Sequence, residues 1–469
     1  MRPFQFHLIV LVVGAALSAA CGAASAETTV RAGTGAQTAR PAISPALRAL
    51  VERGLRAPDD AATIEALRRE GPAGLHALLS EAEASGRLGP ALDPLFDRVA
   101  AQRYARYSGL YWYTDLDRAR ERARAENKPV LSLRLLGDLR EELSCANSRY
   151  FRVVLYPDPA VSVLLRERFV LHWSSERPAP KITVDYGDGR KLVRTVTGNS
   201  VHYVLDASGR VLDALPGLWA PSAFSDELGR SLALARQLSE VSDAEFARAL
   251  RVRHGRDEMT LLGTWKTELD ALGVPLDGSD PAALRAQNRR FAELVQDSNQ
   301  PRTVAATVAA PTAPTKMLSE ARLLPTVAPL PTFSANDIER KSSREVWQRI
   351  AARHRAQVKL SPESLALVRE LAPRGFDLEG HAVPLDEPGF RSLIDGFEQS
   401  LSLDTVRNRL DLHRRIHERL GARPRDGLAE LNAWLYASVF LTPRSDPWLG
   451  LTSDDAFTAL PADGIVGVR

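Results

Sequence analysis

Lys-Pro-Val-Leu-Ser-Leu-Arg-Leu-Leu, at positions 128–136, is the stretch that decides the fold of this chain. It is a short run rich in Val and Leu that follows a charged helical segment and begins beside a proline. Such runs are typical of buried strands. A similar run spans 168–173, and residues 200–212 hold two apolar runs joined by a polar turn at Gly209, which predicts a β-hairpin.

Cys145 lies between the first two predicted strands, and residues 149–155 follow it as a predicted helix. Residues 174–197 form an excursion before the hairpin, and their segment 185–191 is typical of a tight turn between two short strands. This extra hairpin would lie beside Cys145 and would serve either as a recognition arm or as an idle insertion. Its acidic residues lack the spacing of a calcium-binding loop.

The order strand, cysteine-containing turn, helix, strand, excursion and hairpin resembles the thioredoxin-like fold. The resemblance covers about 107–235, under half of the chain. It implies an α/β protein with a central thioredoxin-like mixed sheet, and the apolar periodicity of the rest of the chain predicts mostly helical N- and C-terminal flanks. Segments similar to the family's helix exit, its Asp-Pro-x-Val turn, its Asp-x-x-Gly hairpin and the end of its last strand lie at 119–129, 158–161, 206–209 and Gly217.

The resemblance places the family's first active-site cysteine on Cys145 and its second on Ser148. The proline that normally faces the cysteine pair in a cis peptide should lie near Ser200, where the sequence has none. Ser144 replaces the usual tryptophan, and an insertion at 137–143 lengthens the loop before the cysteine. A site with one cysteine forms no internal disulfide, but it can form a mixed disulfide with a partner thiol.

Cys145, Ser148 and Asn147 are therefore the candidate catalytic residues. The partial positive charge of a helix N-terminus favours a thiolate, which is the reactive nucleophile. We expect Asn147 and Ser148 to donate hydrogen bonds to it, with Ser148 in place of the resolving cysteine. The alternative is that Cys145 is an inert, buried residue of a fold that has lost its chemistry.

Residues 1–26 are typical of an export signal, with Arg2 at the positive end and an apolar core too short to span a bilayer. Cleavage after Ala26 fits an ordinary signal peptide, whereas the segment that ends at Cys21 is similar to a bacterial lipoprotein box. Cys21 is removed in the first case and acylated in the second, which leaves Cys145 as the free thiol. Both alternatives predict a periplasmic or cell-envelope protein, and in the second alternative a lipid anchor at Cys21 is its only membrane attachment.

Composition divides the rest of the chain into segments. Ser44-Pro45 and the capping-box pattern that starts at Ser242 predict helix starts. The predicted organisation is a flexible tether at 27–43, a helical region at 44–106, the thioredoxin-like domain at 107–235, a helical extension at 236–297, a Pro/Ala/Thr-rich linker at 298–333 and a C-terminal helical domain at 334–469.

Two further groups have both a functional and a structural interpretation. The aromatic residues within 104–113 either bind a ligand or pack at the junction between the helical region and the sheet, and we favour the junction because large aromatic residues are mostly buried.

His413 and His417 share one face of a predicted helix, which suits two metal ligands. The arginines between them disfavour a cation, so we expect an exposed helix face, no metal and no cofactor.

Two hypotheses for the function remain once the other classes of protein are excluded. A net charge of +3 over 469 residues gives no indication of a nucleic-acid partner, and the motifs of serine hydrolases and phosphate-binding loops are absent. The first hypothesis is a thioredoxin-family protein that forms mixed disulfides with partner thiols through Cys145, for exchange or sensing; if it is an enzyme, it is a monothiol oxidoreductase. The second is a non-catalytic thioredoxin-fold scaffold of the cell envelope, in which the flanking helices and the aromatic cluster at 104–113 bind a protein partner. The two hypotheses differ in whether Cys145 is accessible, because the first requires a thiol that a partner can reach and the second does not.

Overall fold

The computed structural model describes a part of the chain that begins just before the first helix and contains several gaps. From Ser44 onward the described residues belong to one compact unit. The predicted signal peptide with Cys21, and all but the edge residues of the predicted tether and linker, lie outside the described residues. The described ranges are 43–195, 198–276, 280–299, 333–371, 375–376, 382–383 and 385–446.

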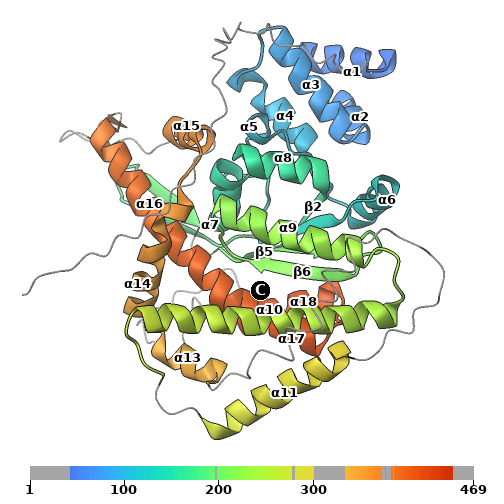
Figure 1. Cartoon of the computed structure of the whole chain (residues 1–469). Coiled ribbons are helices and arrows are strands. Elements are labelled where there is room, and N and C mark those ends of the chain that lie inside the picture. The colour runs from blue at the N-terminus through green and yellow to red at the C-terminus, as the bar shows by residue number, and fades with distance from the viewer. Residues whose placement is uncertain are drawn as a thin grey trace, which may run out of the picture. The chain divides into compact units, whose positions relative to one another are not determined.

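The N-terminal region consists of short helices, as the apolar periodicity predicts (Figure 1). Ser44 accepts a hydrogen bond from the backbone of Leu47 and so caps the first helix, with Pro45 as its first residue. The helices are α1 (Pro45–Arg56), α2 (Ala61–Arg69), α3 (Pro72–Ala84), η1 (Pro90–Leu92), α4 (Asp93–Ala100) and α5 (Ala105–Ser108).

The central region follows the predicted order of strand, cysteine-containing turn, helix, strand, excursion and hairpin. Its elements are α6 (Leu116–Glu126), β1 (Val130–Leu136), α7 (Ala146–Tyr150), the π-helical turn η2 (Phe151–Leu155), α8 (Pro159–Arg168), β2 (Val170–Arg177), β3 (Lys181–Asp185), β4 (Lys191–Thr195), β5 (Ser200–Leu205) and β6 (Val211–Pro216).

A mixed sheet of four strands forms the centre of this region, with the order β2-β1-β5-β6. β1 pairs with β2 in parallel and with β5 antiparallel, and β5 and β6 are also antiparallel. β3 and β4 form a separate two-stranded sheet. The predicted class, a mixed α/β protein with mostly helical flanks, is confirmed.

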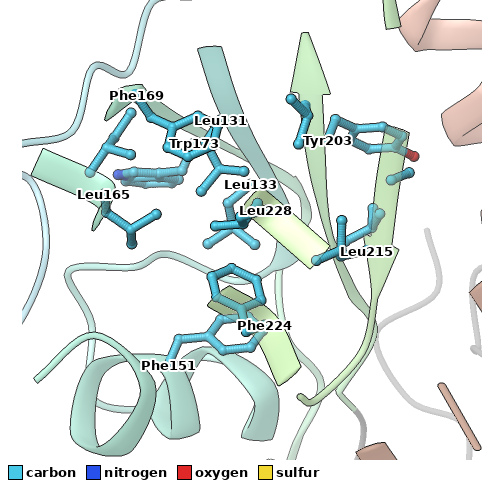
Figure 2. Close-up of a cluster of buried hydrophobic side chains, with 14 of the residues drawn as sticks. Leu131, Leu133, Phe151, Leu165, Phe169, Trp173, Tyr203, Leu215, Phe224 and Leu228 are labelled. Carbon is cyan, nitrogen blue, oxygen red and sulfur yellow. The ribbon is translucent and has the colours of Figure 1, made fainter. Parts of the chain in front are cut away.

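Both faces of the four-stranded sheet are covered, because successive residues of a strand point to opposite sides. On one face, His202 of β5 lies edge-on to Phe151 of η2 and to Phe224 of α9 (Pro221–Gln237). On the other face, the Tyr203 hydroxyl donates to Asn432 of α18 (Leu428–Trp434) at 2.9 Å. Figure 2 shows the buried side chains that fill this core.

The helices after the sheet pack on two shared cores. Ile416 and Leu431 belong to the same apolar cluster as the strands, whereas Trp265, Phe291 and Trp347 form a second cluster. The helical extension and the predicted C-terminal domain therefore bury their apolar faces together with the central region. The other elements here are α10 (Asp243–Ala271), α11 (Pro281–Asn299), α13 (Ala335–Lys341), α14 (Arg344–His354), η3 (Arg355–Val358), α15 (Pro362–Leu371), β7 (Gly375–Phe376), β8 (Ala382–Val383), α16 (Glu387–Arg407), η4 (Asn408–His413), α17 (Arg414–Ala422) and η5 (Leu435–Val439).

Candidate functional site

Cys145 stands at the predicted position, where the chain passes from β1 to α7. It is the residue before the first turn of α7, and its backbone N–H donates to the carbonyl of Leu136 at 3.2 Å. Its exposed fraction is 0%, and it belongs to the apolar cluster that includes the strands. A thiol in this position is closed to a partner thiol in the folded conformation.

Asn147 and Ser148 lie beside Cys145, as predicted, but their side chains have other partners. The Asn147 amide donates to the Ser200 hydroxyl at 2.9 Å. The Ser148 hydroxyl lies 2.6 Å from the Ser144 hydroxyl and 2.9 Å from the carbonyl oxygen of Cys145. Both side chains thus hold the turn together instead of facing the thiol as donors.

Ser200 is the residue near which the resemblance predicted a cis-proline. It is the first residue of β5, and no described residue follows a cis peptide bond. The neighbouring Gly198 leaves no room for a side chain, because a Cβ there would lie 2.8 Å from the Asn147 amide oxygen. This loop is therefore packed against the Cys145 turn through Asn147.

Arg152 is the residue that the sequence analysis missed in this turn. Its side chain is fully buried, and its guanidinium donates to the carbonyls of Glu141 at 2.7 Å and Leu139 at 3.2 Å and to the Ser144 hydroxyl at 3.1 Å. Burial lowers the pKa of Arg152. The insertion at 137–143 is thus tied down by one buried cation, which no local sequence pattern indicates.

The β3–β4 hairpin is fastened to the Cys145 turn at its base. The Thr195 hydroxyl accepts from the Arg149 guanidinium at 2.9 Å and lies 3.3 Å from the carbonyl of Ser144. The prediction that the excursion lies beside Cys145 is confirmed at this point. Beyond its base the hairpin is exposed, including Ile182 at 49% and Val184 at 40%.

The aromatic group at 104–113 lies at the junction between the N-terminal helices and the sheet. Trp112 is fully buried, and its indole N–H donates to the Gln102 side chain at 2.6 Å. Tyr113 pairs with His172 as a short continuation of the sheet beyond β2. The interpretation as a packed junction is confirmed for Tyr111 and Trp112, whereas Tyr104, Tyr107 and Tyr113 are half-buried.

His413 and His417 do not form an exposed helix face, and that expectation is wrong. Both side chains are buried, since the end of η4 and α17 pack against β6 and α10. The helical spacing correctly placed them on one face, but their burial depends on elements far away in the sequence.

Comparison of the chain with protein-family models, curated proteins and solved structures returned no match. Among the described residues, no helix combines the length and the apolar character needed to span a membrane.

Proposed function

We propose that this chain is an exported, non-catalytic interaction protein of the cell envelope, in which a thioredoxin-like central domain is the scaffold and the β3–β4 hairpin binds a protein partner. The sheet supports the thioredoxin-like assignment through its strand order, its single parallel pair and the terminal hairpin. The position of Cys145 directly after the first strand and its turn also supports it.

The exposed apolar face of the hairpin is the observation that carries this proposal. Ile182 and Val184 alternate along β3 and therefore point to the same side, which they share with Leu192, the direct partner of Val184. Tyr186 in the turn is 57% exposed. Exposed apolar residues gathered on one surface are typical of protein–protein interaction sites.

The unpaired outer edges of the hairpin add a second contact type. Within the described part of the chain, β3 and β4 pair only with each other. An edge strand presents free N–H and C=O groups to which an extended segment of a partner can add as a further strand. Backbone pairing would supply affinity, and the apolar side chains would supply selectivity.

The burial of Cys145 favours the scaffold over the mixed-disulfide hypothesis. Thiol exchange requires a thiolate that a partner sulfur can approach. In the described structure the side chain is fully buried and the surrounding polar groups bond to each other. Treatment with iodoacetamide should therefore leave Cys145 unmodified in the folded protein and modify it after denaturation; rapid modification of the folded protein would restore the thiol-exchange hypothesis.

Site-specific photo-crosslinking tests the hairpin. A photoreactive amino acid at position 184 should form adducts with a protein from a cell-envelope extract, whereas the same group at Thr183, on the opposite face, should not. Ile182→Asp should abolish co-purification of that protein, and Thr183→Asp and Cys145→Ala should retain it. Capture that survives Ile182→Asp, or that requires Cys145, would contradict the proposal.

A further inference from the structure

One aspartate and three histidines form a buried polar cluster beside the edge strand of the sheet. Asp213 lies on β6, His254 on α10, His413 at the end of η4 and His417 on α17, and all four side chains are buried. Asp213 and His413 are 200 positions apart, yet Oδ1 and Nε2 lie 2.9 Å from each other. In Figure 1, α10 and α17 are packed together next to β6.

Three of these residues have the chemistry and the spacing of metal ligands. Asp213, His413 and His417 each offer one ligand atom within 4.8 Å of the other two. Zn²⁺ binds imidazole nitrogen and carboxylate oxygen at about 2.0–2.2 Å, which holds ligand atoms roughly 3–3.5 Å apart. A small inward movement of the side chains therefore closes the set around an ion.

The residues around the set hold its members in place. The Asp213 carboxylate accepts from the Ala214 backbone at 2.8 Å and from the Ser231 hydroxyl at 3.1 Å. The Ser231 contact falls on Oδ2, the oxygen that is not bonded to His413, and such outer contacts fix the orientation of a carboxylate ligand in metal sites.

The hydrogen bonds of His254 assign the tautomer of His417. His254 Nε2 lies 3.0 Å from the carbonyl of Leu212, and because a carbonyl only accepts, this nitrogen carries the proton. Nδ1 of the neutral ring then accepts from Nδ1 of His417, 2.8 Å away. His417 is left with a lone pair at Nε2, which is the state that a metal ligand requires.

His413 has a polar atom that nothing satisfies. Its Nδ1 is buried and has no hydrogen-bond partner within the described structure. In its neutral form His413 donates from Nε2 to Asp213, so Nδ1 keeps a lone pair without a donor. An ion at Nδ1 would lie too far from Asp213, which contacts the other ring nitrogen, so a shared ion would replace the proton between Nε2 and Oδ1, and Nδ1 would then carry the ring proton.

The arginines that disfavoured a cation in the sequence are neutralised by carboxylates. Arg414 bonds to Glu339 at 2.8 Å and to Glu418 at 3.0 Å, and Arg415 bonds to Asp411 at 2.7 Å. Their charges are thus balanced outside the cluster.

We propose that Asp213, His413 and His417 bind one Zn²⁺ ion, with His254 as the residue that positions His417. The ion would join β6 of the central sheet to η4 and α17, which lie beyond the predicted linker. This site is independent of the hairpin and of Cys145.

Metal content of the full chain, produced without a polyhistidine tag, tests the site. After chelator treatment and equilibration with Zn²⁺, elemental analysis of the gel-filtered protein should give one Zn²⁺ per chain. Co²⁺ in place of Zn²⁺ should give the intense visible absorption of a tetrahedral centre. Asp213→Asn and His417→Gln should each lower binding at least 100-fold, and His254→Gln should lower it about 10–100-fold.

Two histidines outside the cluster provide controls. His354→Gln on α14 and His172→Gln on β2 should keep the full stoichiometry and affinity. Circular dichroism of each variant separates loss of the site from loss of the fold, and the wild-type titration needs no variant. Absence of Zn²⁺ from the equilibrated wild type, or equal binding by His417→Gln, would overturn the proposal and leave the cluster as a hydrogen-bonded tie between the sheet and the helices.

Discussion

The Cys145 turn and the β3–β4 hairpin are neighbours joined through Thr195, yet they differ completely in exposure. The turn carries the residue with the most reactive chemistry, and that residue is fully buried. The hairpin carries plain apolar side chains, and these are exposed. The difference teaches that residue type suggests what a site can do, whereas accessibility decides whether a partner can use it.

Acidification should cause the largest loss of unfolding free energy, and this loss should arise in the buried core around His202. Burial lowers the pKa of His202 to about 3, and the groups that face it are aromatic rings and the Tyr156 hydroxyl. The unfolded state binds a proton near pH 6.5 and the folded state does not, so stability is full above pH 6.5 and falls as the pH drops towards 3. The loss should reach about 4 kcal/mol for this one histidine.

Urea titrations between pH 7 and pH 4 measure this loss. His202→Gln has no titratable ring, so the slope of unfolding free energy against pH should be smaller in this variant. An unchanged slope would show that His202 is not held neutral in the fold.

Replacing Arg152, the buried cation of the Cys145 turn, should cause the next largest loss of unfolding free energy. Arg152→Met leaves the buried carbonyls that bind the insertion without a donor, which should cost about 3 kcal/mol of unfolding free energy. The loosened turn should also make Cys145 react with iodoacetamide in the folded state. Arg190→Met in the hairpin turn is the matched control, because among the described residues Arg190 bonds to groups of its own exposed turn, and its loss should cost less than about 0.5 kcal/mol. If Arg152→Met and Arg190→Met lowered the unfolding free energy equally, the contrast between the Cys145 turn and the hairpin would not hold.

Cys145→Ala should have a smaller effect on stability and none on partner binding. The substitution removes one buried sulfur, which should lower the unfolding free energy by about 1 kcal/mol. Thermal unfolding and the capture experiment should be run on the same preparation. Loss of capture without loss of stability would make Cys145 a binding residue.

Changes on the hairpin face should have the smallest effect on stability. Ile182→Asp and Val184→Asp are expected to change the unfolding free energy by less than about 0.5 kcal/mol, because both side chains are already exposed. A large destabilisation by Ile182→Asp would mean that the hairpin face is part of the fold and not a free surface.

Local patterns correctly predicted several elements of this protein. The Ser44 cap and the capping box at Ser242 act within a single helical turn, so the residues that make them are close together in the sequence. The order of strands around Cys145 was also predictable, since short apolar runs and turn residues mark each strand where it stands. The excursion at 174–197 was recognised as a hairpin for the same reason.

The sequence by itself thus determined the elements, their order and the α/β class, because each depends on neighbouring residues. Only the tertiary structure decided the environment of the candidate residues. Arg152 reaches a loop 10 or more positions away, and Asp213 meets His413 across 200 positions. No local period encodes such contacts, because they arise when distant apolar faces are buried together and carry the polar side chains with them.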